Sequence, residues 1–484
     1  MKHFKKIVFA KKVNNVSKST FLEALDKENS LTETKNGAKT YNKSGSALLD
    51  FFGQAGAMRN NKDEAVKLFA KAFGEDKLSA IRILFYLRDV RGGQGERDLF
   101  RNCLEWIGVH DENVFNKIIG YVAEYGRWDD LFFDNDKCFE LIDEQLAVDN
   151  TSTNPSLLAK WLPTINASSS NTRIKAKFLA NKLSLSEKEY RILVRNIRKK
   201  IKTVEEKMSA KKWSDIDYST VPSQASRIYK NAFKKHDEER YSQFIEKAEK
   251  GEVKINASTL YPYQIYKSVQ NDYSKTLEAL WNQLPDYTQG KNALVVADVS
   301  GSMMGDPMAV SVSLALYFAE RNKGKFANHF ITFSQNPQLQ KIQGDTLLQK
   351  MNNLERAQWD MNTDLMAVFD LVLNTAVKNN VSQDELPETL YIISDMEFDS
   401  ACRSRVSFDV IKDKYAQVGY KMPNLVFWNV NASGSNLPVR HNEQGVALVS
   451  GFSPNIFKMV VENKTPEEVM FSVINSERYS KIVI

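Results

Sequence analysis

Leu294–Met303, with the sequence LVVADVSGSM, is the stretch from which the fold of the second half of the chain can be predicted. Its apolar, β-branched beginning is typical of a buried strand, and a segment with helical spacing follows within a few residues. A strand that ends in a loop is therefore expected. The loop carries Asp298, Ser300 and Ser302, so that one carboxylate and two hydroxyls come together. At the carboxyl edge of a parallel sheet, such oxygen donors suit Mg²⁺. Taken alone, the DxSxS pattern also fits a plain Ser- and Gly-rich turn.

Two later segments add oxygen donors of the same kind. Asn362-Thr363-Asp364 precedes residues 365–377, which have helical apolar spacing, so we expect Thr363 at the helix N-cap with its hydroxyl in a loop. Residues 390–394, LYIIS, read as a second short apolar strand, and Asp395 follows it directly. Both segments predict a polar side chain at the end of a regular element.

The order of these residues resembles the metal-ion-dependent adhesion site of von Willebrand factor A domains. The residues that carry the resemblance are Asp298, Ser300, Ser302, Thr363 and Asp395. The resemblance implies that they hold Mg²⁺ or Mn²⁺ with one coordination position left for water or for the carboxylate of a protein partner. One departure is Met396, at a position where relatives often have Gly, and Glu397 follows it.

Strand and helix patterns alternate from Ala293 onward, which predicts a doubly wound parallel sheet with helices on both faces. Before it, from Ser46 to about Leu284, amphipathic helical patterns follow one another with short polar or glycine breaks. Stacked helices of this length suggest an α-solenoid, although no clean repeat is found. The fold class expected is therefore α plus α/β.

Several runs across the chain together resemble a family of uncharacterised proteins that join a TROVE-like helical module to a C-terminal A domain, an architecture distantly similar to the Ro ribonucleoproteins. They are SGSALLDFFGQAGAMR, RDVRGGQGER, GRWDDL, KWLPTINASS and PYQIY. The resemblance implies an N-terminal polar arm (1–40), a ring or crescent of HEAT-like repeats (41–288) and an A-like domain (289–484) that contacts the first and the last helices. It also implies that the module binds RNA.

A basic helix offers a surface for RNA independently of that resemblance. Residues 173–202 carry eleven Lys or Arg and two acids, whereas the formal net charge of the whole chain is only +6. Ser186 and Glu189 form a capping-box pattern, and the helix behind them places cations on one face, with Ile192, Leu193, Ile197 and Ile201 opposite. A cationic stripe of this kind suits phosphate contact, although a solvated helix face would look the same. The candidate residues are Arg191, Arg195, Arg198 and Lys202, extended by Arg173, Lys175 and Lys177.

A glycine-rich turn between two helices, residues 88–97, has arginines on both sides. It has two interpretations that the sequence leaves open. The free amides of the turn, with Arg88, Arg91 and Arg97, suit a phosphate, and a glycine C-cap with surface ion pairs would have the same sequence.

The remaining composition excludes several classes of protein. There is no P-loop, no HExxH pairing of the five histidines and no CxxC spacing among Cys103, Cys138 and Cys402. No run approaches the ~20 apolar residues of a membrane helix, and the short apolar run near the N-terminus is too short for a signal peptide. A cytoplasmic, non-enzymatic RNA-binding protein is expected. The alternative is a protein adaptor that docks acidic partners through the metal site, and a metal-dependent hydrolase is disfavoured because it needs more clustered carboxylates.

Overall fold

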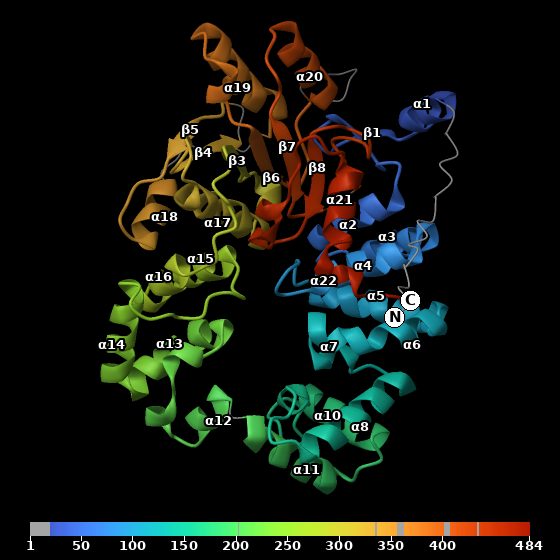
Figure 1. Cartoon of the computed structure of the whole chain (residues 1–484), viewed down its shortest axis with the longest axis vertical. Coiled ribbons are helices and arrows are strands. Elements are labelled where there is room, and N and C mark those ends of the chain that lie inside the picture. The colour runs from blue at the N-terminus through green and yellow to red at the C-terminus, as the bar shows by residue number, and fades with distance from the viewer. Residues whose placement is uncertain (1–19, 202, 334–335, 356–362, 401–406, 433–434) are drawn as a thin grey trace, which may run out of the picture.

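The structure is a computed structural model that describes residues 20–484 except 202, 334–335, 356–362, 401–406 and 433–434. Figure 1 shows helices following one another around an open ring, with a sheet between the two ends of the series. We call α2–α16 the helical region, and the part from β3 to α22 the sheet region.

The helical region is built from short amphipathic helices with polar residues at their ends. Asp76, Asp111 and Asn135 accept hydrogen bonds from the first-turn amides of α4, α6 and α8, which fixes where these helices begin. The helices are α2 (Ala47–Gln54), α3 (Lys62–Glu75), α4 (Lys77–Arg88), α5 (Arg97–His110), α6 (Glu112–Ile118), α7 (Val122–Tyr125), α8 (Asp136–Thr151), α9 (Leu158–Trp161), α10 (Ser170–Lys182), α11 (Glu187–Ile201), α12 (Val204–Ser209), α13 (Ser223–His236), α14 (Glu238–Glu249), α15 (Pro262–Asn271) and α16 (Lys275–Asn282).

The sheet region contains a six-stranded sheet in the order β5-β4-β3-β6-β7-β8. All neighbouring strands are parallel except β4 and β5, which are antiparallel. The strands are β3 (Ala293–Asp298), β4 (His329–Phe333), β5 (Leu339–Lys341), β6 (Thr389–Ser394), β7 (Asn424–Asn429) and β8 (Val446–Ser450). The helices are α17 (Asp306–Arg321), α18 (Leu347–Glu355), α19 (Leu365–Lys378), α20 (Ser407–Gln417), α21 (Pro466–Ile474) and α22 (Glu477–Ser480).

The strand order changes direction between β3 and β6, because the chain adds β4 on one side of β3 and then returns to add β6, β7 and β8 on the other. Open α/β sheets bind ligands at the carboxyl ends of the strands at such a point. The two apolar strands predicted before Asp298 and at residues 390–394 are confirmed within one residue as β3 and β6. The antiparallel edge strand β5 was not predicted, since only three residues of it pair.

The sheet region contacts both ends of the helical region, as expected. At one end α2 packs on β8, and at the other α15 packs on α17. The turn that directly follows α2 also lies close to β8, because residue 56 is glycine: the Gly56 amide donates to Ser450 Oγ at 3.0 Å, and a Cβ there would lie 2.9 Å from the Ser450 carbonyl carbon. Any larger residue would force the helix away from the strand.

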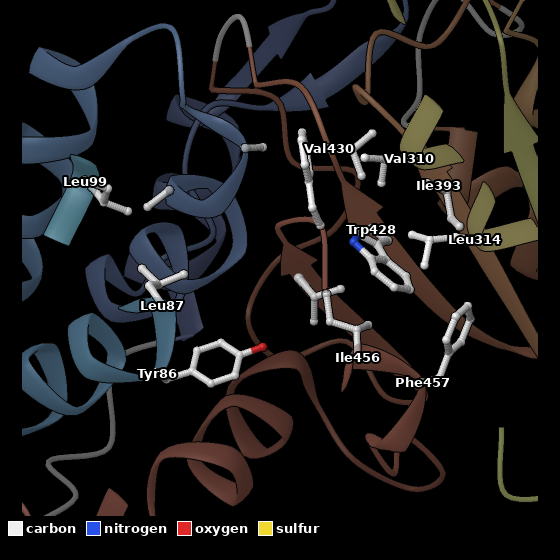
Figure 2. Packing of buried hydrophobic residues seen from close by; sticks show 14 of the residues in the cluster. Tyr86, Leu87, Leu99, Val310, Leu314, Ile393, Trp428, Val430, Ile456 and Phe457 are labelled. Atoms are coloured by element: carbon white, nitrogen blue, oxygen red, sulfur yellow. The ribbon is translucent and has the colours of Figure 1, made fainter. Parts of the chain in front are cut away.

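One hydrophobic core runs through both regions. Figure 2 shows buried side chains continuing from Tyr86 and Leu87 on α4, through Ile456 and Trp428, to Leu314 on α17. The Trp428 indole N–H donates to the Gly451 carbonyl oxygen at 2.6 Å, so this large side chain is buried without an unpaired polar atom. The two regions therefore form one packed body.

The segment before the helical region is folded in its described part, residues 20–41, whereas the sequence predicted a polar arm. It forms α1 (Thr20–Asn29) and an antiparallel hairpin of β1 (Leu31–Glu33) and β2 (Lys39–Tyr41). The hairpin lies on the sheet region, where backbone hydrogen bonds join Tyr41 and Leu437. These three-residue strands have little apolar periodicity, and contacts with distant residues hold them in place.

No helix in the described ranges has the length and apolar content needed to span a bilayer.

Candidate functional site

Two acidic residues lie side by side at the carboxyl edge of the sheet. Strands β3 and β6 are neighbours and parallel, so their ends meet at the same edge. Asp298 is the last residue of β3, and Asp395 directly follows β6. The sequence prediction of two strand-end carboxylates at one edge is therefore confirmed.

The Asp298 carboxylate is fully buried and fixed by two donors. Its Oδ1 accepts from the Ser300 amide at 2.8 Å, and its Oδ2 accepts from the Ser394 hydroxyl at 2.6 Å. Burial raises the pKa of Asp298 to about 6, against the effect of these hydrogen bonds. A nearby cation would offset the cost of burying the charged form.

The two serines after β3 bring their hydroxyls together. Ser300 Oγ and Ser302 Oγ are 3.1 Å apart, as two ligands of one ion would be. Ser300 is buried, whereas Ser302 is exposed. The loop that carries Ser302 is held by Asn431, whose side-chain amide donates to the Ser302 carbonyl oxygen at 2.9 Å. The site therefore has a buried floor and an exposed rim at Ser302.

Asp395 carries a carboxyl oxygen without a hydrogen bond. Its Oδ1 accepts from the Glu397 amide at 3.1 Å, whereas Oδ2 is buried and forms no hydrogen bond of full geometry among the described residues, with the Ser302 hydroxyl beside the carboxyl group. Burial raises the pKa of this carboxyl group. An unpaired buried oxygen is costly, and a bound cation would remove that cost.

Met396, which directly follows Asp395, has a φ of +67°. This is the left-handed conformation that Gly adopts without strain and that a bulky residue rarely adopts. The Met396 side chain is buried. A left-handed turn therefore follows Asp395 although residue 396 is not Gly.

Thr363 is buried beside the same turn. Its hydroxyl donates to the Glu397 carbonyl oxygen at 2.9 Å, and its amide donates to Asp399 Oδ2 at 2.7 Å. The predicted N-cap role of Thr363 is wrong, because Asp364 caps α19 by accepting from the Ala367 amide at 3.0 Å. The Thr363 hydroxyl remains in the loop before α19, as predicted. Asn362 lies outside the described residues.

These donors fit a hard divalent cation. They offer two carboxylates and three hydroxyls, a set that suits Mg²⁺ or Mn²⁺ better than a softer metal. In the part of the chain that the structure describes, no cluster of three or more His, Cys, Asp or Glu residues forms a metal site. The candidate site therefore depends on its hydroxyls, and Asp298, Ser300, Ser302, Thr363 and Asp395 are the residues that would hold the ion.

The glycine-rich turn at residues 88–97 uses its amides internally. The amides of Arg91 and Gly92 donate to the two carboxyl oxygens of Asp89, and those of Gly93 and Gly95 donate to the Asp89 carbonyl oxygen. Asp89 in turn accepts from the guanidinium of Arg478 on α22. These contacts make the turn a junction with the sheet region and leave none of these four amides for a phosphate.

The three arginines of that turn have different environments. Arg88 is 1% exposed and its guanidinium pairs with Asp130 at 2.8 Å, so it offers no surface to a ligand. Arg91 donates to the Glu124 carbonyl oxygen at 3.1 Å. Arg97 is about half exposed and lies 3.5 Å from Asp98. Of the three, Arg88 is buried, whereas Arg91 and Arg97 are both exposed.

The basic helix predicted after Ser186 is confirmed as α11, together with the capping box of Ser186 and Glu189, and the preceding segment with Arg173, Lys175 and Lys177 forms α10. The buried face of α11 carries Tyr190, Val194 and Ile197, whereas Ile192, predicted to be on it, is exposed. The buried face of α11 is therefore shifted by about one residue from the face that the sequence predicted.

Arg191, Arg195 and Lys175 are exposed and form no ion pair within the described ranges. Arg198 is different: its guanidinium donates to the Ala159 carbonyl oxygen at 2.7 Å and to the Thr164 hydroxyl at 2.9 Å, so it holds the loop after α9.

Two further cations of the basic helices are engaged. Arg173 donates to the carbonyl oxygens of Ala167 and Ser168 at 2.7 and 2.8 Å. Lys177 pairs with Glu187 at 2.9 Å, and both side chains are exposed. Lys202 lies outside the described residues.

A cavity of about 800 Å³ lies inside the ring. Its walls come from α4 and α5 on one side and from α13 and α15 on the other, which face each other across the ring in Figure 1. Its lining is basic and aromatic, with fewer acids: Lys62, Arg97, Arg127, Lys160, Trp161, Tyr229, Tyr261 and Tyr263, against Glu96, Asp98 and Glu205.

A second cavity, of about 710 Å³, is lined by Arg191 and Arg195 and shares Lys160 and Glu205 with the first. The exposed arginines of α11 therefore lie next to the inside of the ring. Sequence reasoning missed Trp161 and Arg127, whose guanidinium carbon lies 4.2 Å from the Trp161 ring centre. The aromatic residues in KWLP and GRWDD were the available signal.

Comparisons with known proteins find similarity along most of the chain. Residues 292–481 match a domain of unknown function (DUF7788), and residues 34–112 and 139–299 match another (DUF2828). The chain is 29% identical to the uncharacterized protein L728 of Acanthamoeba polyphaga mimivirus over 92% of its own length and 87% of that protein. The boundary near residue 292 coincides with the start of β3.

Proposed function

We propose that this chain is an RNA-binding scaffold similar to the Ro ribonucleoproteins. In this proposal the helical region is a TROVE-like ring of HEAT-like repeats that holds RNA, and the sheet region is a von Willebrand factor A-like domain that closes the ring. The protein acts without catalysing a reaction. Its place of action is the cytoplasm.

The cavity inside the ring is the observation that carries the proposal. It combines cations such as Lys160 and Arg127 with the ring of Trp161, and the exposed arginines of α11 lie beside it. Single-stranded nucleic acid is bound by this combination, because cations contact the phosphates and aromatic rings stack on the bases. A merely solvated helix face would not adjoin a cavity with aromatic walls.

In the same proposal the sheet region holds Mg²⁺ or Mn²⁺ with the five oxygen donors at the carboxyl ends of β3 and β6. The ion, when bound, supplies positive charge that attracts the carboxylate of a protein partner. Two features support this role. The buried Asp395 Oδ2 would be stabilised by a positive neighbour, and Ser302 is exposed at the rim, where a partner can approach. Glu397 and Asp399 are engaged with Lys35 and Thr363, which disfavours a second, hydrolytic metal.

The same rim favours a second candidate function, a protein adaptor in which the metal site is the working part. In that case the helical region presents the site to acidic partners and binds no RNA. The two candidate functions differ in the part of the molecule that binds the partner: the helical region binds RNA in the first, and the sheet region binds an acidic protein in the second.

The test is the affinity for a labelled single-stranded oligouridylate over a range of salt concentrations. The double variant Arg191→Gln/Arg195→Gln keeps helix propensity and removes two charges. If both contact phosphate, the slope of log K against log salt becomes shallower by about 1.4. Arg198 is left unchanged because its loss would release the loop after α9.

Lys234→Gln/Lys235→Gln is the matched control, because both lysines are exposed on α13 and line neither cavity. Equal affinity and slope in the arginine variant, the lysine variant and the wild type would refute RNA binding through α11. Loss of a protein partner in Asp298→Asn, combined with that result, would establish the adaptor function.

A further inference from the structure

The tip of the N-terminal hairpin, residues 34–38, lies on the loops that hold the candidate metal ligands. Thr34 Oγ1 donates to the Phe398 carbonyl oxygen at 2.7 Å, and Asn36 Nδ2 donates to the Glu397 carbonyl oxygen at 2.7 Å. In the opposite direction, the Ser400 amide donates to the Asn36 carbonyl oxygen at 3.2 Å. The hairpin tip is thus bound to the turn that follows Asp395.

The tip also reaches one of the candidate ligands directly. Asn36 Nδ2 lies 3.5 Å from Thr363 Oγ1. The Thr363 hydroxyl already donates its proton to the Glu397 carbonyl oxygen, so only its lone pairs remain for a cation. An amide hydrogen directed at this oxygen competes with the cation for them.

The charge of Lys35 also weakens cation binding at the candidate site. Its amide donates to Glu397 Oε2 at 2.8 Å, and its ammonium group lies 3.8 Å from Glu397 Oε1. Glu397 is buried and two residues from Asp395. A positive charge held here repels a divalent cation at the neighbouring carboxylates.

We propose that the hairpin tip is an internal competitor of the cation: with the tip docked, the site has low affinity, and cation binding favours release of the tip. This inference rests on the metal site proposed above. Because the coupling is reciprocal, a docked tip must weaken cation binding by the same factor by which the cation weakens tip docking. Only a few residues separate β2 from α2, so in this proposal release of the tip also affects α2, the first helix of the ring.

A disulfide can lock the tip in the docked position. A Cβ built on Gly37 lies 3.6 Å from the Ser400 Cβ, within the spacing of disulfide-bonded cysteines. The variant is Gly37→Cys/Ser400→Cys in a Cys402→Ser background, so that Cys402 cannot exchange with the new pair. Gly37 has a φ of +81°, so a cysteine there is strained. The strain is present in both redox forms and cancels when they are compared.

The measurement is a Mn²⁺ titration of this full-length variant, oxidised and reduced, beside the wild type. We expect the oxidised form to bind Mn²⁺ at least about fivefold more weakly than the reduced form. Equal affinities would overturn the competitor role while leaving the metal site in place. No Mn²⁺ binding by the wild type would overturn the site and the competitor together.

A charge variant gives a second test that does not depend on a new disulfide. Lys35→Gln should bind Mn²⁺ more tightly than the wild type. Its control is Lys39→Gln on the same hairpin, because Lys39 pairs with Glu33 at 2.6 Å and touches no candidate ligand. An unchanged affinity in Lys35→Gln, or an equal rise in Lys39→Gln, would overturn the charge argument.

The reciprocal readout is amide hydrogen exchange of residues 34–38. It should become faster when Mn²⁺ is added to the wild type and should stay slow in Asp298→Asn. Protection that rises on addition of Mn²⁺ would show that the tip assists the cation and would reverse the proposal.

Discussion

Replacing Asp130 by Ala should strongly destabilise the protein, because the Asp130 carboxylate compensates a fully buried arginine. Its Oδ2 accepts from Arg88 Nε at 2.8 Å and from the Arg127 amide at 2.9 Å, and its Oδ1 accepts from Arg101 Nε at 2.8 Å. Arg88 and Asp130 are each about 1% exposed. The variant therefore leaves the Arg88 charge away from water without the acid that it contacts.

The expected loss follows from that burial. Removing one partner of a buried ion pair typically costs about 3–5 kcal/mol. For a chain of 484 residues that unfolds as one unit, the unfolding entropy is on the order of 1 kcal/mol per degree, so the melting temperature should fall by about 3–5 °C. If the helical region unfolds by itself, the fall should be roughly twice as large.

The assay is thermal unfolding followed by circular dichroism and calorimetry. Asp98→Ala is the control, because Asp98 lies in the first turn of α5 and forms an exposed pair with Lys62 at 3.2 Å. An exposed pair contributes about 0–1 kcal/mol, so this variant should melt within about 1 °C of the wild type.

The comparison also decides the role of the glycine-rich turn. If Asp130→Ala and Asp98→Ala melt together, and oligouridylate binding falls only in the former, Arg88 serves a phosphate and the structural explanation is refuted. A large loss of stability with unchanged binding at a temperature where the variant is folded supports the turn as a junction.

Three further outcomes are expected. Asp298→Asn should lose Mn²⁺ binding in titration calorimetry while its affinity for naked oligouridylate stays that of the wild type; retained Mn²⁺ binding would reject Asp298 as a ligand. Burial raises the pKa of Asp50 from 3.8 to about 6. The native protein therefore holds this proton more tightly than the unfolded chain does. As the pH rises through that range, the contribution of Asp50 to stability falls. Asp50→Asn should therefore melt above the wild type at neutral pH and equal to it near pH 4, and a constant difference across the range would contradict this. Lys211, exposed after α12, has a φ of +58°, so Lys211→Gly should raise the free energy of unfolding by up to ~1 kcal/mol in thermal melts, whereas a lower melting temperature would show that its side chain is needed.

The sequence predicted the sheet and its acidic edge well, because those features are local. The run before Asp298 is buried at every position of β3, so its apolar pattern was unambiguous. Thr363 was placed in the right loop but given the wrong helix position, since Thr and Asp are both good N-caps and the adjacent Asp364 took the role. The choice between two neighbouring capping residues depends on which one the rest of the fold engages, here through Glu397 and Asp399.

The features that were not predicted depend on residues far away in the chain. Arg198 has the helical spacing of Arg191 and Arg195, but spacing does not show that α9 and the loop after it bring three oxygen acceptors to its guanidinium. The hairpin at residues 31–41 carries no periodic signal, because its partners lie beyond residue 360. The cavity inside the ring likewise exists only once helices from opposite ends of the helical region face each other.

The contacts of the N-terminal hairpin and α2 with the sheet region have a consequence for synthesis on the ribosome. Gly56 meets Ser450, and Tyr41 meets Leu437, almost four hundred residues later. While the chain is growing, the side of α2 that packs on β8 has no partner until the last strands emerge, although α3 and α4 already cover its other side. We therefore expect nascent chains that lack β8 to be held by chaperones or to aggregate, since exposed apolar surface on an incomplete fold promotes both.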